Sequence, residues 1–433
     1  MAIHALILME SELGSLGGGE SVTHGLVRGL AAIDRGSDRI SLLCPPRLAQ
    51  DLLTSAGDAV RIITRPAPPP NPGSLLRAAL GPLRRPAGKL VRRVLQKPEV
   101  GLPDAPPPLD PFILSLQADV IHFFMPLQYA TGGPPAVFTV QDLQHEHLPG
   151  IFTESHMRYR RALFDAVRRC EALVAISNFT AADFQRHHPV PPEKLFTIPY
   201  ASYVEPAAAD GTLSAEEAAR LASLPPAFIF YPALSYRHKN HIALLDALSR
   251  IERDSGVRIP LVCTGGRSDH WQNVLARHAT LTPQPALIDL GFTSRPVLLA
   301  LYRRTRFVVF PTLFEGAGLP LLEAIRLQAP IACSDIPPFR EFGGDGPAFF
   351  DPHDVASMAR VIHSFWEDNS ARARTVELTS AHRSAALTWE TCARRYLAVY
   401  RFAAGAPLSQ EDHQLLDACR SLDPAPPAPK NIR

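Results

Sequence analysis

Short apolar segments alternate with longer helical patterns along almost the whole chain, and this alternation constrains the fold more than any other feature. Each segment is apolar on both faces, which is typical of parallel strands that lie between two layers of helices. The candidate strands occupy residues 5–9, 40–44, 120–124, 136–140, 173–176 and 195–198 in the first half, and 228–231, 261–263, 286–290, 307–310, 331–333 and 348–350 in the second. The pattern predicts an α/β fold of two Rossmann-like lobes, each built on a doubly wound parallel sheet.

The chain has 433 residues, which is too long for one ordinary hydrophobic core and agrees with two domains. We expect a first lobe over residues 1–204, a linker over 205–226 that is rich in alanine and acidic residues, and a second lobe over 227–384. An amphipathic pattern predicts a helix within 385–404. The tail at 405–433 ends in alternating proline and alanine, which predicts disorder.

A proline-rich segment at 65–108 interrupts the strand and helix alternation of the first lobe. Between Leu75 and Lys97 it holds seven Lys or Arg residues and no acidic residue. Two interpretations remain open. The segment is either a solvated surface insertion or a basic amphipathic element that binds an anionic membrane surface.

Composition indicates a globular protein, with 46% hydrophobic and 20% charged residues. The net charge of +2 says nothing about partners, and we expect no nucleic-acid partner. No apolar run reaches the roughly eighteen residues of a membrane span, and no basic leader precedes the first strand. The six cysteines are scattered without a C-x-x-C pair, which is typical of reduced core cysteines. We therefore expect a cytoplasmic protein.

The most informative segment spans residues 310–325 and reads FPTLFEGAGLPLLEAI. An apolar strand ends, a loop with Gly316 and Gly318 follows, and a helix opens with proline in its first turn. Ligands bind beyond the carboxyl ends of such strands, glycines let the backbone approach a phosphate, and a helix N-terminus favours an anion. Glu315 and Glu323 beside an anion site indicate the hydroxyl groups of a ribose and a hexose. The alternative is that both glutamates only complement the helix dipole.

This segment, with seven residues between its two glutamates and Gly-Leu-Pro among them, resembles the signature of retaining glycosyltransferases of family 4, which have the GT-B architecture. The resemblance continues through residues 231–241, 290–293, 329–341 and 349–352, so that it covers nearly all of 223–400. It implies two lobes that face each other across a cleft, a nucleotide-sugar donor bound in the second lobe, and a C-terminal helix that crosses back to the first.

By this resemblance, Glu323 binds the ribose hydroxyls of the donor and Glu315 binds its hexose. The backbone of Gly318 and Leu319 contacts the hexose and the phosphate. Lys239 is implied to bind the diphosphate. It follows the candidate strand at 228–231 at the same edge of the sheet, and a lysine is a point charge suited to a diphosphate.

A second cation for the diphosphate departs from the family pattern. The family usually has an arginine five residues before the lysine, but this chain has Leu234 there, and Arg237 is the candidate substitute. The remaining donor contacts that the resemblance implies come from both lobes. They are Gly18, Gly19, Ser177, Phe292 and Thr293.

The segment that follows the candidate strand at 136–140 carries Gln141, Asp142, His145 and His147. Many family members have histidine where Gln141 stands. We expect Asp142 and His145 to take part in catalysis, while three roles stay open for the histidines: contact with sugar or acceptor, a structural role, or metal ligation with Asp142. The sequence has no D-x-D motif and no further ligand cluster, so we predict no metal cofactor.

These observations predict a retaining glycosyltransferase that moves a hexose from a nucleotide sugar to a hydroxyl of a cell-surface glycan or glycolipid. The predicted donor is GDP-mannose, because bacterial mannosyltransferase-like members share the strings at 142–145, 231–233 and 238–241, while glucose, galactose and rhamnose remain open as the donor sugar. In the implied mechanism, the leaving diphosphate accepts the proton of the incoming hydroxyl on the same face of the sugar. The alternatives are a nucleotide-sugar epimerase, a non-catalytic nucleotide-sugar-binding protein, or a glycoside hydrolase with Glu315 and Glu323 as acid and base.

Overall fold

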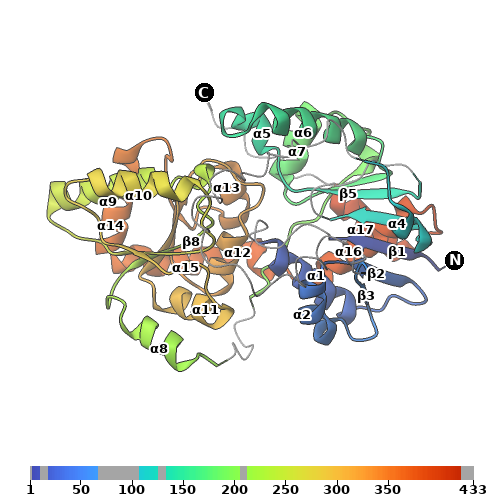
Figure 1. The fold of residues 1–433 in the computed structure, drawn as a ribbon, viewed down its shortest axis with the longest axis horizontal. Helices are drawn as coiled ribbons and strands as arrows, with labels where there is room; N and C mark the ends of the chain where they lie inside the picture. Colours follow the sequence, from blue (N-terminus) through green and yellow to red (C-terminus); the bar gives the residue numbers. More distant parts are fainter. Residues whose placement is uncertain (1, 10–17, 67–106, 125–132, 205–211, 421–433) are drawn as a thin grey trace, which may run out of the picture.

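The computed structural model describes residues 2–9, 18–66, 107–124, 133–204 and 212–420, which form two lobes (Figure 1). Each lobe is built on one parallel sheet, so the predicted fold class is confirmed. The first sheet, in the order β3-β2-β1-β4-β5-β6-β7, consists of β1 (His4–Leu8), β2 (Arg39–Leu43), β3 (Arg61–Ile63), β4 (Val120–Phe123), β5 (Ala136–Val140), β6 (Ala172–Ala175) and β7 (Leu195–Thr197). The second, in the order β10-β9-β8-β11-β12-β13, consists of β8 (Ile229–Pro232), β9 (Leu261–Thr264), β10 (Leu287–Asp289), β11 (Phe307–Phe310), β12 (Ile331–Ser334) and β13 (Ala348–Phe350).

Strand β3 is the strand that the sequence pattern did not predict. It has three residues, begins with the exposed Arg61 and pairs only with β2 at the edge of the first sheet. An edge strand needs no continuous apolar run, because only one neighbouring strand and part of each face cover it. Its sequence signal is therefore weak.

The strand order of the second sheet reverses between β8 and β11. From β8 the chain moves outward to β9 and β10, and from β11 it moves outward on the other side to β12 and β13. The connections leave these two neighbouring strands in opposite directions, which opens a crevice at their carboxyl ends. β1 and β4 form the corresponding point in the first sheet. The topology thus predicts a ligand site at the loops that follow β8 and β11.

Helices surround both sheets (Figure 1). Those of the first lobe are α1 (Gly19–Ala32), α2 (Pro46–Ala56), α4 (Pro111–Ser115), α5 (Gln144–His147), α6 (Glu154–Val167) and α7 (Asn178–His187), with short 3-10 turns η2 (Pro149–Ile151) and η3 (Pro192–Lys194). Those that accompany the second sheet are α8 (Ala215–Ala222), η4 (Arg237–Lys239), α9 (His241–Ser255), α10 (His270–Thr280), α11 (Arg295–Arg304), α12 (Leu319–Arg326), α13 (Pro337–Gly343), α14 (Val355–Glu367), α15 (Asn369–Ala381) and η5 (Arg383–Ala386). Two helices end the described chain, α16 (Trp389–Ala403) and α17 (Gln410–Arg420).

Helix α16, which lies within the predicted helical region 385–404, packs on the first lobe along α1. Gly25 and Gly29 of α1 permit this close approach, because a Cβ at either position would lie within 2.2 Å of an atom of Trp389. Tyr400 joins α16 to β4 through a hydrogen bond between its Oη and Nδ1 of His122, at 2.8 Å. The chain therefore returns to the first lobe after it completes the second.

The prediction of a disordered tail at 405–433 is wrong for its first part. Helix α17 packs against α16 and β7, and it buries Leu416 and Cys419. Arg401 of α16 forms ion pairs with Asp412 of α17 at 2.9 Å and with Asp38 at 2.8 Å. The proline-rich composition of the end of the chain masks the amphipathic pattern of this short helix. Residues 421–433 lie outside the described residues.

The predicted linker at 205–226 contains α8, whose first turn is capped reciprocally by Ser214 and Glu217. The Glu217 carboxylate also accepts a hydrogen bond from Ser294 Oγ at 2.5 Å, which ties α8 to the start of α11. Residues 205–211 and most of the proline-rich segment, including the basic stretch 75–97, lie outside the described residues.

All six cysteines are buried free thiols, in agreement with their interpretation as core residues. Burial raises the pKa of Cys263 and of Cys392 to about 12, so that these thiols stay protonated at neutral pH. Throughout the described part of the chain, no helix combines the length and the hydropathy that a membrane span requires.

Candidate active site

The loops that follow β8 and β11 meet at the crevice of the second sheet. The Leu313 N–H donates a hydrogen bond to the His238 carbonyl at 2.8 Å. Asn240 adopts a left-handed backbone with φ of 60°, and its side-chain amide donates to the Pro311 carbonyl at 3.1 Å. These bonds fix one loop against the other, so that the side chains on both loops have defined positions.

Lys239 and Glu315, one from each loop, form an ion pair with 2.5 Å between Nζ and Oε1. The Tyr231 hydroxyl donates to the Lys239 carbonyl at 2.6 Å and fixes the lysine backbone. Both charged side chains remain 16% exposed, so each can also reach a ligand.

A pocket lies beside this ion pair, and Lys239, Glu315, Thr312 and Gly318 are among the residues that line it. Gly318 caps α12 with a left-handed φ of 87°, and a Cβ there would lie 2.5 Å from the Phe339 ring. Only glycine satisfies both restrictions. The N-terminus of α12 therefore opens into the pocket, where its N–H groups and the lysine favour an anion such as a phosphate.

Glu323 lies in α12 behind that N-terminus. The Tyr302 hydroxyl of α11 donates a hydrogen bond to Glu323 Oε2 at 3.0 Å. Burial raises the pKa of Glu323 to about 7, although the hydrogen bond from Tyr302 and the charge of Arg295 act in the opposite direction. Glu323 as a whole residue is only partly buried, and an ionised carboxylate can accept hydrogen bonds from vicinal hydroxyls. No local sequence signal marks Tyr302 as a functional residue, because it lies in a helical pattern typical of core residues.

The second cation of the predicted diphosphate site is less defined. Arg237 begins η4 and is exposed. Leu234 packs toward Gly266, where a Cβ would lie 2.9 Å from the leucine Cδ2. The neighbouring Arg267 is engaged by Asp289, with 2.9 Å between Nε and Oδ2. Arg237 thus keeps an exposed guanidinium, and its contact with the diphosphate stays a prediction.

Phe292 and Thr293 follow β10 at the carboxyl edge of the second sheet. The preceding Gly291 has a left-handed φ of 64° and turns the chain after the strand. Phe292 is 78% exposed, which leaves its ring face open. An exposed aromatic ring can stack on a nucleobase, so this position suits the base of a nucleotide sugar.

The two lobes touch each other at the predicted glycine loops. A Cβ at Gly18, which precedes α1, would lie 2.3 Å from Leu319 Cδ1. A Cβ at Gly316 would lie 2.0 Å from the Gln141 carbonyl oxygen, and Ser177 Oγ donates to the Gly316 carbonyl at 2.6 Å. The Ser177 side chain is fully buried, so in this structure its hydroxyl joins the lobes rather than facing the pocket.

A second contact between the lobes involves Glu341 of α13. Its two carboxylate oxygens accept the backbone N–H groups of Asn178 and Phe179, at 2.8 and 3.0 Å. These N–H groups belong to the first turn of α7, where a carboxylate also complements the helix dipole. This contact could not be predicted from the sequence, because the partners are more than 160 residues apart and neither position carries a local signal.

Asp142 and His147 lie where the first lobe meets the second. The Asp142 Cβ would be 3.2 Å from a Cβ at Gly316, which places this aspartate next to the glycine loop of the second lobe. The His147 ring stacks on Phe314 with 4.8 Å between ring centroids, and its Nε2 lies 2.7 Å from Asp183 Oδ2. Because Phe314 directly precedes Glu315, His147 is the histidine of this segment that lies near the pocket.

His145, by contrast, is fully buried within the first lobe. Its ring stacks on Phe164 at 5.0 Å, and burial lowers its pKa to about 3. Residues two apart on a helix do not share a face, so α5 turns His145 inward when His147 faces the second lobe. The structure therefore does not support the predicted contact of His145 with a sugar or acceptor. It also does not gather Asp142, His145 and His147 into one metal site.

Two protein-family descriptions match separate parts of the chain. Glycosyltransferase Family 4 matches residues 47–201, which lie in the first lobe. Glycosyl transferases group 1 matches residues 215–380. This second match contains the whole second sheet together with Lys239, Glu315 and Glu323.

Curated relatives include bacterial mannosyltransferases. The chain is 26% identical over 275 residues to the O-antigen chain mannosyltransferase B of Escherichia coli, a match that covers 61% of this chain and 70% of the relative. It is 32% identical over 248 residues to the serotype-specific mannosyltransferase WbdA of Escherichia coli. That match covers 56% of this chain but only 30% of WbdA, so the chain corresponds to a part of this longer protein.

Solved glycosyltransferases share the fold over nearly their whole length. WaaG, a glycosyltransferase involved in lipopolysaccharide biosynthesis, has a TM-score of 0.61 at 14% identity, covering 92% of this chain and 99% of WaaG. Anabaena Alr3699/HepE, solved in complex with UDP and glucose, has a TM-score of 0.61 at 16% identity, covering 91% of this chain and 98% of that one. With one family match in each lobe and this shared GT-B fold, the chain belongs to glycosyltransferase family 4 and is a mannosyltransferase-like glycosyltransferase.

Proposed function

We propose that this glycosyltransferase moves mannose from GDP-mannose to a hydroxyl of a growing cell-surface glycan and retains the configuration at the transferred carbon. The observation that carries the proposal is the convergence of Lys239, Glu315 and the N-terminus of α12 on one pocket. The choice of mannose rests on the relatives, which include O-antigen chain mannosyltransferase B.

The proposed donor fits this site from its diphosphate outward. Lys239, with Arg237 as a second cation, and the N–H groups of α12 bind the diphosphate. Glu315 accepts hydrogen bonds from the mannose hydroxyls, and Glu323 accepts them from the ribose. Phe292 stacks on the base. Each of these side chains belongs to a residue that is at least partly exposed.

The proposed transfer is a displacement on one face of the sugar. The bond between the anomeric carbon and the phosphate oxygen breaks, and the acceptor oxygen bonds to the same carbon from the same face. The proton of the acceptor hydroxyl passes to the leaving phosphate oxygen. Lys239 and the helix N-terminus stabilise the charge that develops on the phosphate. No protein carboxylate has to act as a base.

A thermal-shift series tests the donor. At one hundred times its dissociation constant a ligand adds about 2.7 kcal/mol to stability, so GDP-mannose should raise the melting temperature more than UDP- or dTDP-sugars do. Lys239→Ala should lose the shift, while Lys194→Ala in η3 of the first lobe is the matched control. Labelled mannose should then appear in a glycan acceptor. A larger shift with a UDP-sugar would refute the donor, and epimerised donor without any transfer would refute the reaction.

We also propose that the diphosphate needs no metal ion, because Lys239 and the N-terminus of α12 supply the positive charge. Turnover should continue in EDTA and should not rise with added Mg²⁺ or Mn²⁺. Loss of turnover in EDTA that Mn²⁺ restores would contradict this proposal.

Finally, we propose that the basic stretch 75–97 brings the enzyme to an anionic membrane that carries a lipid-linked acceptor. Each of its seven cations near such a surface is worth about 1 kcal/mol. Replacing the cations by glutamine should release the chain from phosphatidylserine vesicles without changing its affinity for GDP-mannose. Equal vesicle binding before and after would show that this stretch does not mediate membrane contact.

A further inference from the structure

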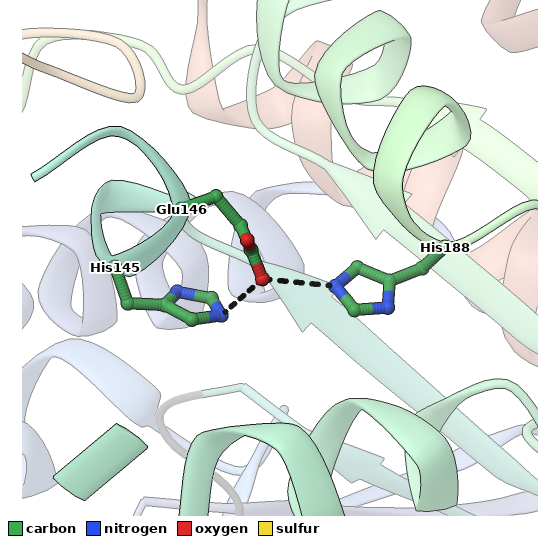
Figure 2. Close-up of side chains that lie close together, drawn as sticks. All are labelled: His145, Glu146 and His188. Carbon is green, nitrogen blue, oxygen red and sulfur yellow. Dashed lines mark ion pairs between the residues drawn. The ribbon is translucent and has the colours of Figure 1, made fainter. Parts of the chain in front are cut away.

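We propose that His145, Glu146 and His188 bind a zinc ion in the first lobe, and that the metal holds α5 against the end of α7. Figure 2 shows these side chains, with the two imidazoles directed at one carboxylate. His145 and Glu146 belong to α5, and His188 directly follows α7. The inference does not depend on the proposed donor, because none of these residues lines the donor pocket.

The distances between the three candidate ligand atoms fit a zinc ion after a small rotation of the Glu146 side chain. One ligand atom from each residue lies within 4.8 Å of the other two. Glu146 Oε1 is 3.3 Å from His145 Nε2 and 3.9 Å from His188 Nε2. Zinc binds nitrogen and oxygen at about 2.0–2.2 Å, so donors of a tetrahedral site lie roughly 3.3–3.6 Å apart. Glu146, whose side chain is 29% exposed, has room to close the longer separation by side-chain rotation.

The buried ring nitrogens give an independent reason for a metal. Within the described ranges of the chain, both ring nitrogens of His145 and Nε2 of His188 are buried without a hydrogen-bond partner. A buried polar atom without a partner costs about 1–3 kcal/mol. Both imidazoles stack on Phe164, with centroid distances of 5.0 and 4.8 Å, which fixes the planes of the rings. A zinc ion would satisfy one nitrogen of each ring.

The donor set and its surroundings suit zinc. Two imidazoles and one carboxylate are common zinc ligands, and water can complete the tetrahedron on the side where Glu146 is exposed. Arg160, whose charge acts on His145, opposes a cation here. Asp183, which contacts His147 and His187 and is only 1% exposed, supplies a further negative charge close to α5. The carboxylates Glu146 and Asp183 together compensate the arginine and part of the metal charge.

The consequence of such a site is structural. Helix α5 carries His147, which stacks on Phe314 of the second lobe, and it follows Asp142, which lies beside Gly316. A metal bound between α5 and the end of α7 would fix this segment without touching the donor pocket. It would thereby fix the surface that the first lobe presents to the loop of the second lobe that carries Phe314 and Gly316.

The test uses the full chain without a polyhistidine tag, since such a tag binds zinc. After incubation with zinc and gel filtration, elemental analysis should give about one zinc per chain, and zinc should raise the melting temperature. Cobalt in its place should give the visible absorption of a tetrahedral site. Glu146→Gln and His188→Ala should each weaken zinc binding by more than about 100-fold, because even outer-shell partners of a metal are worth about 10–100-fold. His187→Ala is the matched control, since this neighbouring ring contacts Asp183 instead.

Absence of stoichiometric zinc in the unmodified chain would overturn the proposal, even where a variant fails to fold. Unchanged affinity in both Glu146→Gln and His188→Ala would place the ion elsewhere and would also overturn it. Zinc binding is measured without nucleotide sugar, so its failure is distinguishable from failure of the proposed donor. A chain that binds zinc but not GDP-mannose would refute only the donor.

Discussion

The hydroxyl of Tyr302 should control how donor binding depends on pH. It donates to Glu323 Oε2 at 3.0 Å and stabilises the ionised carboxylate, whose pKa burial has raised to about 7. Tyr302→Phe keeps the ring but removes this hydrogen bond. Glu323 then takes up a proton at a higher pH, and a protonated carboxyl accepts hydrogen bonds from ribose less well than a carboxylate. The variant should therefore bind the donor poorly at neutral pH and regain binding in more alkaline solution.

The magnitude follows from the strength of this bond. A hydrogen bond to a charged group is worth about 1.5–3 kcal/mol, and one pKa unit corresponds to about 1.36 kcal/mol. Loss of the bond should raise the pKa of Glu323 by roughly one to two units. If only the ionised form binds ribose, the donor KM at pH 7.5 should rise about 3- to 25-fold. The kcat should change little, because ribose is distant from the reacting carbon and its contacts are the same in ground and transition states.

The assay measures donor KM and kcat between about pH 6 and 9.5 with saturating acceptor. In the unmodified enzyme, KM should rise as the pH falls through the pKa of Glu323, and in Tyr302→Phe that midpoint should move upward. Tyr396→Phe is the matched control, because this ring is equally buried and its hydroxyl faces Thr139 in the first lobe at 3.4 Å. An unchanged midpoint in Tyr302→Phe, or an equal change in Tyr396→Phe, would refute the reasoning.

Four further predictions concern the two glutamates, Gly316 and the C-terminal helix α17. Glu323→Gln should raise donor KM roughly ten- to two-hundred-fold. Glu315→Gln should instead lower kcat by a similar factor, because Glu315 contacts the hexose, on which positive charge develops in the transition state. The reverse pattern would exchange the roles of the two glutamates. Glu323→Gln should also raise the melting temperature at pH 8 but not at pH 4. The pKa of Glu323 in the folded chain, about 7, lies above its ordinary value of 4.5, so ionisation of this carboxyl destabilises the fold only as the pH rises through the interval between these values. An equal change of the melting temperature at both pH values would contradict this prediction. Gly316→Ala should lower kcat/KM at least about tenfold while calorimetry finds donor binding little changed, because its Cβ would lie 2.0 Å from a carbonyl of the other lobe; unchanged turnover would refute the contact. Deletion of residues 406–433 should lower the melting temperature, because it removes α17 and the buried ion pair of Asp412, whereas deletion of 421–433 alone serves as the control.

Much of the fold was determined by the sequence alone, because a parallel strand that is buried on both faces appears in the sequence as a short continuous apolar run. Twelve apolar runs predicted strands of both sheets, and among the strands in the described part of the chain only the partly exposed edge strand β3 was not predicted. The amphipathic pattern near Trp389 likewise predicted a helix where α16 lies. The tail was misjudged because its composition is dominated by its last residues, while α17 is held by contacts with α16 and Arg401.

The position of Lys239 and Glu315 at one edge of the second sheet was also predictable, for a topological reason. Lys239 and Glu315 each follow a buried strand, and neighbouring parallel strands present their carboxyl ends at the same edge of a sheet. The strand pattern places both residues at the same edge of the sheet, and the family resemblance implied a common ligand. The structure shows that β8 and β11 are neighbours and that the charged atoms of these residues, 76 positions apart in sequence, are 2.5 Å apart. Gly318 carried a similar local signal, because a glycine before a helix indicates a turn that other residues cannot make.

Only the tertiary structure decided which way the remaining side chains face. His145 and His147 look equivalent in sequence, yet one lies in the core and the other meets Phe314 of the second lobe. Ser177 resembles a donor ligand but joins the lobes, while Tyr302 gives no local sign of its bond to Glu323. The physical reason is that a local pattern records burial and loop geometry. Contacts between lobes, and between helices far apart in the chain, depend on how whole segments pack, and no short stretch of sequence contains that information.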